Sequence, residues 1–299
     1  MNRVNQNSVS NTSRADSVRF HTENRPALGS AGTRWLLIAV AFAFMTLFLL
    51  FPLVCVFYEA FSDGFMPFIK TVAGKNTLNA VKMTLIATCI AVPLNIVFGL
   101  TAAWCIGKFQ FWGKGILISL IDIPFAISPI IVGLLFIFLF GSQSALGRFL
   151  DERGIKLLFS TPAVVIVTIF VTFPFVVREL VPVMQAQGTD EEQAARVLGA
   201  GGWKIFWRVT LPNIKWALLY GAILCNARAM GEFGAAVVVV RNNDKTNTLP
   251  LYINALYQGY SLPSAPFAAA TLLATTAILT LIIKTLLEMK IRSTKESDD

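Results

Sequence analysis

A few ionisable side chains lie inside segments of this chain that are otherwise apolar. Arg228 and Glu232 are four residues apart in the stretch NARAMGEFGA, where Asn226 also occurs, so the two charges fall on one face of a helix. Asp122 lies in another apolar segment. A charge in a low-dielectric environment needs a partner or water. These residues are therefore candidates either for structural ion pairs and helix caps or for a polar path that a charged solute crosses.

The few histidines and cysteines argue against conventional enzyme chemistry. The single histidine, His21, lies in the polar N-terminal stretch, and the four cysteines fall inside apolar segments without a CxxC spacing. Metal sites and Ser-His or Cys-His nucleophile pairs are therefore not expected. No GxxxxGK[ST] occurs, so the chain does not bind ATP through a P-loop. We expect no cofactor and no enzyme activity in this chain; an intramembrane enzyme with Asp122 and Glu232 as a dyad is the less favoured alternative.

The composition places the chain in a membrane. Of its 299 residues, 55% are hydrophobic and only 14% are charged, with a mean hydropathy of +0.65, which is too apolar for a soluble globular protein. A membrane span needs about 20 mostly apolar residues, and six such windows fit the sequence. They are 35–58, 80–105, 116–140, 162–181, 214–239 and 266–287. We expect an all-α protein with six transmembrane helices.

The basic residues predict which side of the membrane each loop faces, because lysine and arginine are enriched in cytoplasmic loops. With the N-terminus inside, fifteen of them, Arg178 included, fall in cytoplasmic segments and seven in outside loops. This asymmetry accounts for the net charge of +8 without nucleic acid as a partner. We expect both termini to be cytoplasmic, with a disordered tail over 1–34, the membrane domain over 35–288 and a short tail over 289–299.

Between the fourth and fifth predicted spans lies a polar and aromatic stretch, DEEQAARVLGAGGWKIFWRVTLP. Thr189 and Glu192 have the spacing of a capping box, acidic residues fill the first turn, and Gly199 is placed to end the helix. Ala194 and Ala195 give this short helix a narrow face. Alanines chosen for helix propensity in an ordinary loop would give the same pattern, so a close contact with a partner is one of two interpretations.

The second half of this stretch separates aromatic from basic residues. Trp203, Phe206 and Trp207 are spaced by three and four residues, whereas Lys204 and Arg208 occupy another face. Aromatic rings favour the headgroup depth of a bilayer and the cations can face anionic lipid, so we expect an interfacial helix. The Leu-Pro pair that follows is expected to begin the fifth span.

The segments QAARVLG and VTLP resemble the EAA loop of ABC-importer permease subunits: EAA, a glycine after three further residues, then a hydrophobic residue and Leu-Pro. Gln193 stands where that family usually has glutamate. The resemblance implies that the loop over 182–213 docks in a groove of a cytoplasmic ATPase subunit, with the two alanines allowing close approach and Gly199 giving the bend. It assigns to this coupling loop Glu192, Gln193, Ala194, Ala195, Gly199, Leu211 and Pro212.

Three longer stretches, DIPFAISPIIVGLLF, TIFVTFPFVVRELVPVM and NARAMGEFGA, resemble the permeases for sulfate, thiosulfate and molybdate, most closely the CysW-type sulfate/thiosulfate family. The resemblance implies the MetI-like fold of type I ABC importers in a bacterial inner membrane. Implied partners are a homologous permease of the CysT or CysU type, two ABC ATPase subunits that bind ATP and Mg²⁺, and a periplasmic sulfate/thiosulfate-binding protein.

The same resemblance gives the ionisable residues of the spans a transport role. It makes Arg228, Glu232, Asn226 and Asp122 candidates for the translocation path, because a dianion that enters a low-dielectric passage needs transient positive partners. Two alternatives stay open. One is a molybdate or tungstate permease, and the other is a gradient-driven secondary anion transporter that uses Glu232 and Asp122 as protonatable groups.

Overall fold

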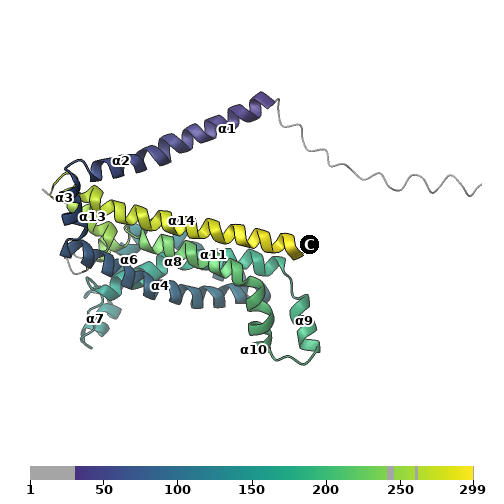
Figure 1. Ribbon diagram of the computed structural model, residues 1–299. Coiled ribbons are helices and arrows are strands. Elements are labelled where there is room, and N and C mark those ends of the chain that lie inside the picture. The colour runs from purple at the N-terminus through teal and green to yellow at the C-terminus, as the bar shows by residue number, and fades with distance from the viewer. Residues whose placement is uncertain (1–30, 241–245, 260–261, 299) are drawn as a thin grey trace, which may run out of the picture. The chain divides into compact units, whose positions relative to one another are not determined.

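The computed structural model describes residues 31–240, 246–259 and 262–298, and every regular element in these ranges is a helix (Figure 1). The expected all-α class is confirmed for these residues. Most of the disordered tail expected over 1–34 lies outside the described residues, and the first helix already begins at Ala31.

Two compact units divide the chain at Pro52. The first helical run consists of α1 (Ala31–Met45), a π-helical turn η1 (Thr46–Leu50) and α2 (Phe51–Ala60). Pro52 has no N–H to donate, and the wider π turn before it closes with a bond from the Phe51 N–H to the Thr46 carbonyl. The apolar run Gly32–Ala60 is long enough to cross a membrane, as predicted for 35–58.

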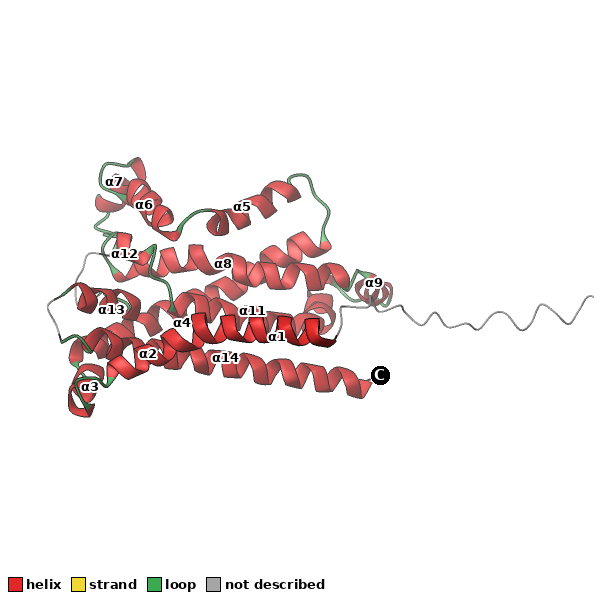
Figure 2. Cartoon of the chain, turned by 90° about the horizontal axis from the view of Figure 1, so that it is seen from above, coloured by secondary structure: helices red, strands yellow, loops and turns green. Residues whose placement is uncertain are grey.

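Three helices form the centre of the second unit (Figures 1 and 2). They are α4 (Lys75–Lys108), α8 (Thr161–Ala186) and α11 (Leu211–Met230). Membrane helices associate through close packing of their backbones, which small residues allow. A Cβ on Gly99 of α4 would come within 2.8 Å of the Val176 side chain of α8, and one on Gly107 within 2.8 Å of Met184. These two crossings between α4 and α8 therefore need glycine.

The third predicted span, 116–140, is not one continuous helix. It consists of α5 (Lys114–Ala126) and α6 (Pro129–Phe140), which are bent by 109° relative to each other (Figure 2). The residue before a proline avoids the helical region, and both Ile127 and Ser128 have extended backbone. Pro129 then begins α6, where its missing N–H leaves no bond unmade.

The fifth predicted span, 214–239, is also interrupted. α11 ends at Met230, and a short helix, α12 (Ala236–Val239), follows after a break. Glu232 lies in this break, where its Oε1 accepts a hydrogen bond of 2.9 Å from the Ala235 N–H. The carboxylate thus satisfies a backbone donor at a helix end, as buried backbone in a membrane requires.

Apolar side chains of α8 line two buried clusters. In its first half, Val164, Val167 and Val171 pack with residues of α4, α6 and α12. In its second half, Leu180 and Met184 pack with residues of α4, α5 and α11. The core of the second unit therefore follows α8, which has the highest share of buried residues among the candidate spans.

The remaining helices lie at the two ends and along one side of this unit (Figure 1). At one end are α3 (Phe65–Val72), α7 (Ala145–Asp151) and α13 (Leu249–Gln258); at the other are α9 (Asp190–Val197), α10 (Gly202–Ile205) and the π turn η2 (Phe206–Thr210). The last helix, α14 (Ala265–Asp298), ends on the side of α9. The tail predicted over 289–299 is therefore helical over 289–298, where it continues α14.

Among the residues that the structure describes, four helical stretches can cross a membrane by length and composition, and the bent pair of α5 and α6 would be a fifth. The four are Gly32–Ala60, Lys75–Lys108, Thr161–Ala186 and Ala265–Leu286. The helix α11, which carries Lys215 and Arg228, is not among them. Composition alone thus accounts for fewer than the six spans predicted.

Candidate coupling and translocation sites

The short helix α9 begins where the sequence predicts but is capped differently. Thr189 occupies the N-cap position without accepting a backbone bond, and the Gln193 Nε2 donates to its hydroxyl at 2.8 Å. Glu192 points elsewhere, so the predicted capping box is wrong. The physical reason is that Glu192 meets a cation, and a charge-assisted contact is stronger than a neutral cap.

The Glu192 carboxylate is held inside the protein by the end of α4. The Lys108 Nζ lies 3.0 Å from the Glu192 Oε1 and donates to the Gly188 carbonyl at 2.6 Å. The Thr210 hydroxyl donates to the same carboxylate oxygen at 2.7 Å. The side chain of Lys108 is only 5% exposed and that of Glu192 is 18% exposed. We call Lys108, Glu192 and Thr210 the anchor of α9; sequence reasoning missed Lys108 and Thr210, because neither is close to Glu192 in the chain.

A second set of bonds fastens the same region to the start of α11. The Asn213 side chain donates to Glu191, and the Gln187 side chain donates to the Asn213 carbonyl at 2.9 Å. α9 is thus fixed to α4 through one acidic residue and to α11 through its neighbour. A displacement of α9 is expected to be transmitted to both long helices.

The free face of α9 is apolar at its C-terminal turn. Val197 is 88% exposed and Leu198 is 87% exposed, and Ala194 on the same helix is exposed. Gly199 ends the helix as predicted, with a φ of +83°, and a Cβ there would meet open space. We call Ala194, Val197, Leu198 and Gly199 the docking surface. The sequence reasoning found the alanine and the glycine but overlooked Val197 and Leu198.

The helix end itself is well formed. The Ala200 N–H donates to the Ala195 carbonyl and the Gly199 N–H to the Arg196 carbonyl, each at 3.0 Å, which is the Schellman arrangement. Ala195 is partly buried, whereas Arg196 is exposed. The apolar residues therefore stand out from a rigid turn.

The aromatic stretch after α9 is only partly interfacial. Trp203 and Trp207 are 71% and 53% exposed, as an interfacial helix would have them, but Phe206 is buried against Trp104 of α4, with ring centroids 5.0 Å apart. Pro212 does not start a new helix either, because the chain is helical without interruption from α10 through η2 into α11. As at Pro52, a π turn precedes the proline. It closes with a bond from the Leu211 N–H to the Phe206 carbonyl and accommodates a proline that has no N–H to donate.

Arg228 and Glu232 form the ion pair that their spacing predicts. The Arg228 Nη1 lies 2.6 Å from the Glu232 Oε2, at an ion-pair distance without the angle of a hydrogen bond. Arg228 is 31% exposed and Glu232 is 2% exposed, so the arginine alone reaches the surface of the chain. Asn226 does not join them; its amide contacts the Met230 sulfur at 3.9 Å.

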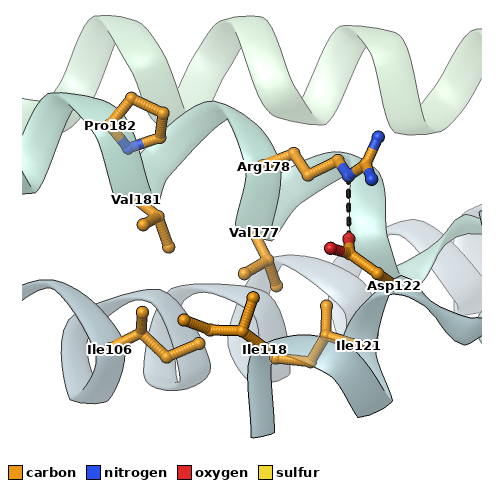
Figure 3. Close-up of a pocket in the computed structure, with 8 residues that line it drawn as sticks. All are labelled: Ile106, Ile118, Ile121, Asp122, Val177, Arg178, Val181 and Pro182. Atoms are coloured by element: carbon orange, nitrogen blue, oxygen red, sulfur yellow. Dashed lines mark hydrogen bonds and ion pairs between the residues drawn. The ribbon is translucent and has the colours of Figure 1, made fainter. Parts of the chain in front are cut away.

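Asp122 is paired with an arginine that the sequence analysis assigned to a cytoplasmic segment. Arg178 instead lies inside α8, and its Nε donates to the Asp122 Oδ1 at 2.9 Å (Figure 3). The pair borders a cavity of about 160 Å³, otherwise lined by apolar side chains of α4, α5 and α8. Asp122 and Glu232 each contact a different arginine, so they do not form a catalytic dyad.

Comparison with known proteins gives a match over the part of the chain that contains these residues. Residues 95–293, from the middle of α4 nearly to the end of α14, match the family described as "Binding-protein-dependent transport system inner membrane component". The chain belongs to this family. It is a multi-pass membrane protein with the all-helical MetI-like fold of ABC transporter permeases.

Sulfate transport permeases are among the relatives of this permease. The sulfate transport system permease protein CysW of Synechocystis sp. is 47% identical over 258 residues, which cover 86% of this chain and 93% of CysW. The sulfate transport system permease protein CysT of Escherichia coli K12 is 32% identical over 244 residues, which cover 81% of this chain and 88% of CysT.

A solved transporter shares the fold of this permease. It is a bacterial alginate ABC transporter, crystallised with an alginate pentasaccharide-bound periplasmic protein. The two match with a TM-score of 0.70 over 87% of this chain and 96% of the other, at 19% sequence identity. At that identity the likeness concerns the fold alone.

Proposed function

We propose that this permease is one of the two membrane subunits of an ATP-driven importer for sulfate and thiosulfate. The identity with CysW over nearly its whole length supports this substrate class. Its partners are a homologous permease of the CysT type, two ABC ATPase subunits that bind ATP and Mg²⁺, and a periplasmic sulfate-binding protein. The chain supplies half of the translocation path and binds no nucleotide itself.

In a bacterial inner membrane, this assembly has six spans in the chain, with α11 as the fifth and both termini in the cytoplasm. α11 is 20 residues long, which suffices to cross the hydrocarbon core, and its charges lie near its ends. The coupling loop over 182–213 is then cytoplasmic, together with the tails over 1–34 and 289–299, while α3, α7 and α13 face outward. The end of α14, which lies at the same end of the second unit as α9, supports this arrangement.

The observation that carries the coupling role is a rigid apolar turn on an anchored helix. The docking surface exposes Val197 and Leu198 almost fully, and exposed apolar groups outside the membrane indicate a contact with another protein. The anchor ties the same helix to α4 and α11. Closure of the ATPases would pull α9 and turn these helices, opening the path outward; hydrolysis reverses the movement.

The test is transport by the purified complex in vesicles with ATP inside the compartment that corresponds to the cytoplasm. Sulfate uptake should require ATP, the ATPase and the binding protein, and should persist when a protonophore collapses the proton gradient. Uptake that needs the gradient and no ATPase would establish the secondary transporter instead. Uptake of molybdate or tungstate in preference to sulfate and thiosulfate would correct the substrate class.

A further inference from the structure

Arg178 and its neighbour Glu179 are the two charged residues of α8, a helix that is otherwise suited to a bilayer. Arg178 lies eight residues before the end of α8 at Ala186, which is about 12 Å at 1.5 Å per residue. Its side chain is 51% exposed on the chain and that of Asp122 is 40% exposed. An exposed charged pair at this depth does not face hydrocarbon, because charges inside spans face water-filled space or other protein. This face of α5 and α8 therefore borders either water or another subunit of the transporter.

The guanidinium is held in a way that leaves its outer edge open. Its Nε donates to the Asp122 Oδ1, and the Phe125 ring lies beneath it, 4.1 Å from Cζ to the ring centroid. Figure 3 shows one terminal nitrogen pointing away from the aspartate and the other lying beside Nε. In the described part of the chain neither of them donates a hydrogen bond. Two parallel N–H donors of this kind match the oxygens of a tetrahedral oxyanion.

A second arginine lies deeper along the same bundle. The Cys225 thiol contacts the Thr172 carbonyl, so α8 and α11, which run in opposite directions, are level at these residues. Arg178 is six residues from Thr172 toward the end with α9, and Arg228 is three residues from Cys225 toward the other end. The two arginines are thus about 14 Å apart along the bundle. Each is paired with one carboxylate.

We propose that Arg178 is an oxyanion-binding residue of the translocation path. It forms a second cationic binding site, on the cytoplasmic side of Arg228. The proposal rests on the proposed import of sulfate and adds a residue to it. Asp122 keeps the guanidinium extended and offsets part of its charge. A passing dianion then binds through the free terminal nitrogens but is released, as conduction through successive sites requires.

The test compares variants of the complete transporter in proteoliposomes, with sulfate as the probe. Arg178→Gln should lower sulfate uptake at least tenfold, while the ATPase still co-purifies and the binding protein loaded with sulfate still stimulates ATP hydrolysis. The double variant Arg178→Gln with Asp122→Asn should stay equally low, because the cation is absent. Restored uptake in the double variant would overturn the proposal, since a merely structural pair tolerates loss of both charges.

Arg178→Lys covers the case in which the glutamine variant does not assemble. Lysine keeps the charge and a contact with Asp122 but has no fork, so uptake should fall several-fold in a complex that assembles normally; uptake at the wild-type rate would refute the oxyanion role. The matched control is Arg153→Gln, because the Arg153 guanidinium also lies over a ring, that of Phe149, but outside the candidate spans. A wild-type complex that does not move sulfate would defeat the proposed function rather than this inference.

Discussion

At the scale of single residues, we expect a large loss of stability when Lys108, the buried lysine at the end of α4, is replaced. Lys108→Ala leaves the Glu192 carboxylate with the Thr210 hydroxyl but without its cation in a mostly buried place. We expect a loss of stability of about 3 kcal/mol, as for other broken buried pairs, seen as a lower melting temperature of the purified permease complex. Lys114→Ala is the control, because Lys114 is bonded only weakly, to the Phe109 carbonyl at 3.4 Å. Equal melting temperatures for the two variants would contradict the anchor.

Replacing Arg228 tests whether its ion pair with Glu232 belongs to the translocation path. Arg228→Ala leaves Glu232 buried without its cation, although the carboxylate keeps its bond from the Ala235 N–H. We expect sulfate uptake to fall more than tenfold in a complex that still assembles, measured by uptake and by co-purification of the subunits. Normal uptake would end the anion-path interpretation, whereas failed assembly would favour a structural pair.

At the scale of elements, we expect substitutions at the C-terminal turn of α9 to abolish binding of the ATPase without unfolding the helix. Leu198→Ser removes an 87% exposed apolar side chain that contributes almost nothing within the chain. Ala195→Glu adds a large charged group, and Gly199→Asp adds the strain of a side chain at a φ of +83°, which costs about 1 kcal/mol. All three should insert in the membrane but lose ATPase binding and uptake.

The control for α9 is Arg196→Ala, since Arg196 is exposed and outside the docking surface, and its effect should be milder. Co-purification of the ATPase together with uptake assays reads out all four variants. The docking assignment would not survive full ATPase binding and normal uptake in Ala195→Glu and Gly199→Asp.

The contact of α4 with α8 makes a second element-scale prediction. A Cβ at position 99 would come within 2.8 Å of Val176, so Gly99→Ala should destabilise the bundle by about 1–3 kcal/mol. Gly115→Ala in α5 is the matched control, because nothing lies within 4 Å of its Cβ position and alanine favours a helix by up to about 1 kcal/mol. Thermal unfolding in detergent should show opposite shifts, and a tolerated Gly99→Ala would mean that the helices separate easily.

At the scale of the whole molecule, the proposed topology turns on α11. Three spans, α8, α11 and α14, separate the loop after α7 from the C-terminus if α11 crosses the membrane, and two if it does not. Alkaline phosphatase fused after Arg153 should therefore be active, and the same enzyme fused at Asp299 should be inactive. Activity at both sites would remove α11 from the membrane.

The sequence by itself determined what depends on composition and on neighbours within one helix. The apolar fraction required a bilayer, and continuous apolar runs of about 20 residues required helices. The four-residue spacing brought Arg228 to Glu232, and Gly199 ended α9, because both effects act within one or two turns. The EAA-like pattern likewise lies within one short stretch. Family membership followed from these local features and was confirmed by the comparisons.

Only the tertiary structure decided which distant groups meet. Asp122 and Arg178 are 56 residues apart, and Thr210 and Glu192 are 18 apart, so no local spacing pairs them. The capping box failed for this reason: Glu192 fits the local motif, but the packing of α4 brings Lys108 to it, and a buried cation outcompetes a backbone N–H. In the same way, Phe206 packs against Trp104 in the core and does not lie at the membrane interface where the sequence predicted it. A charged or aromatic side chain can contact several kinds of partner, and the fold decides which of them is close.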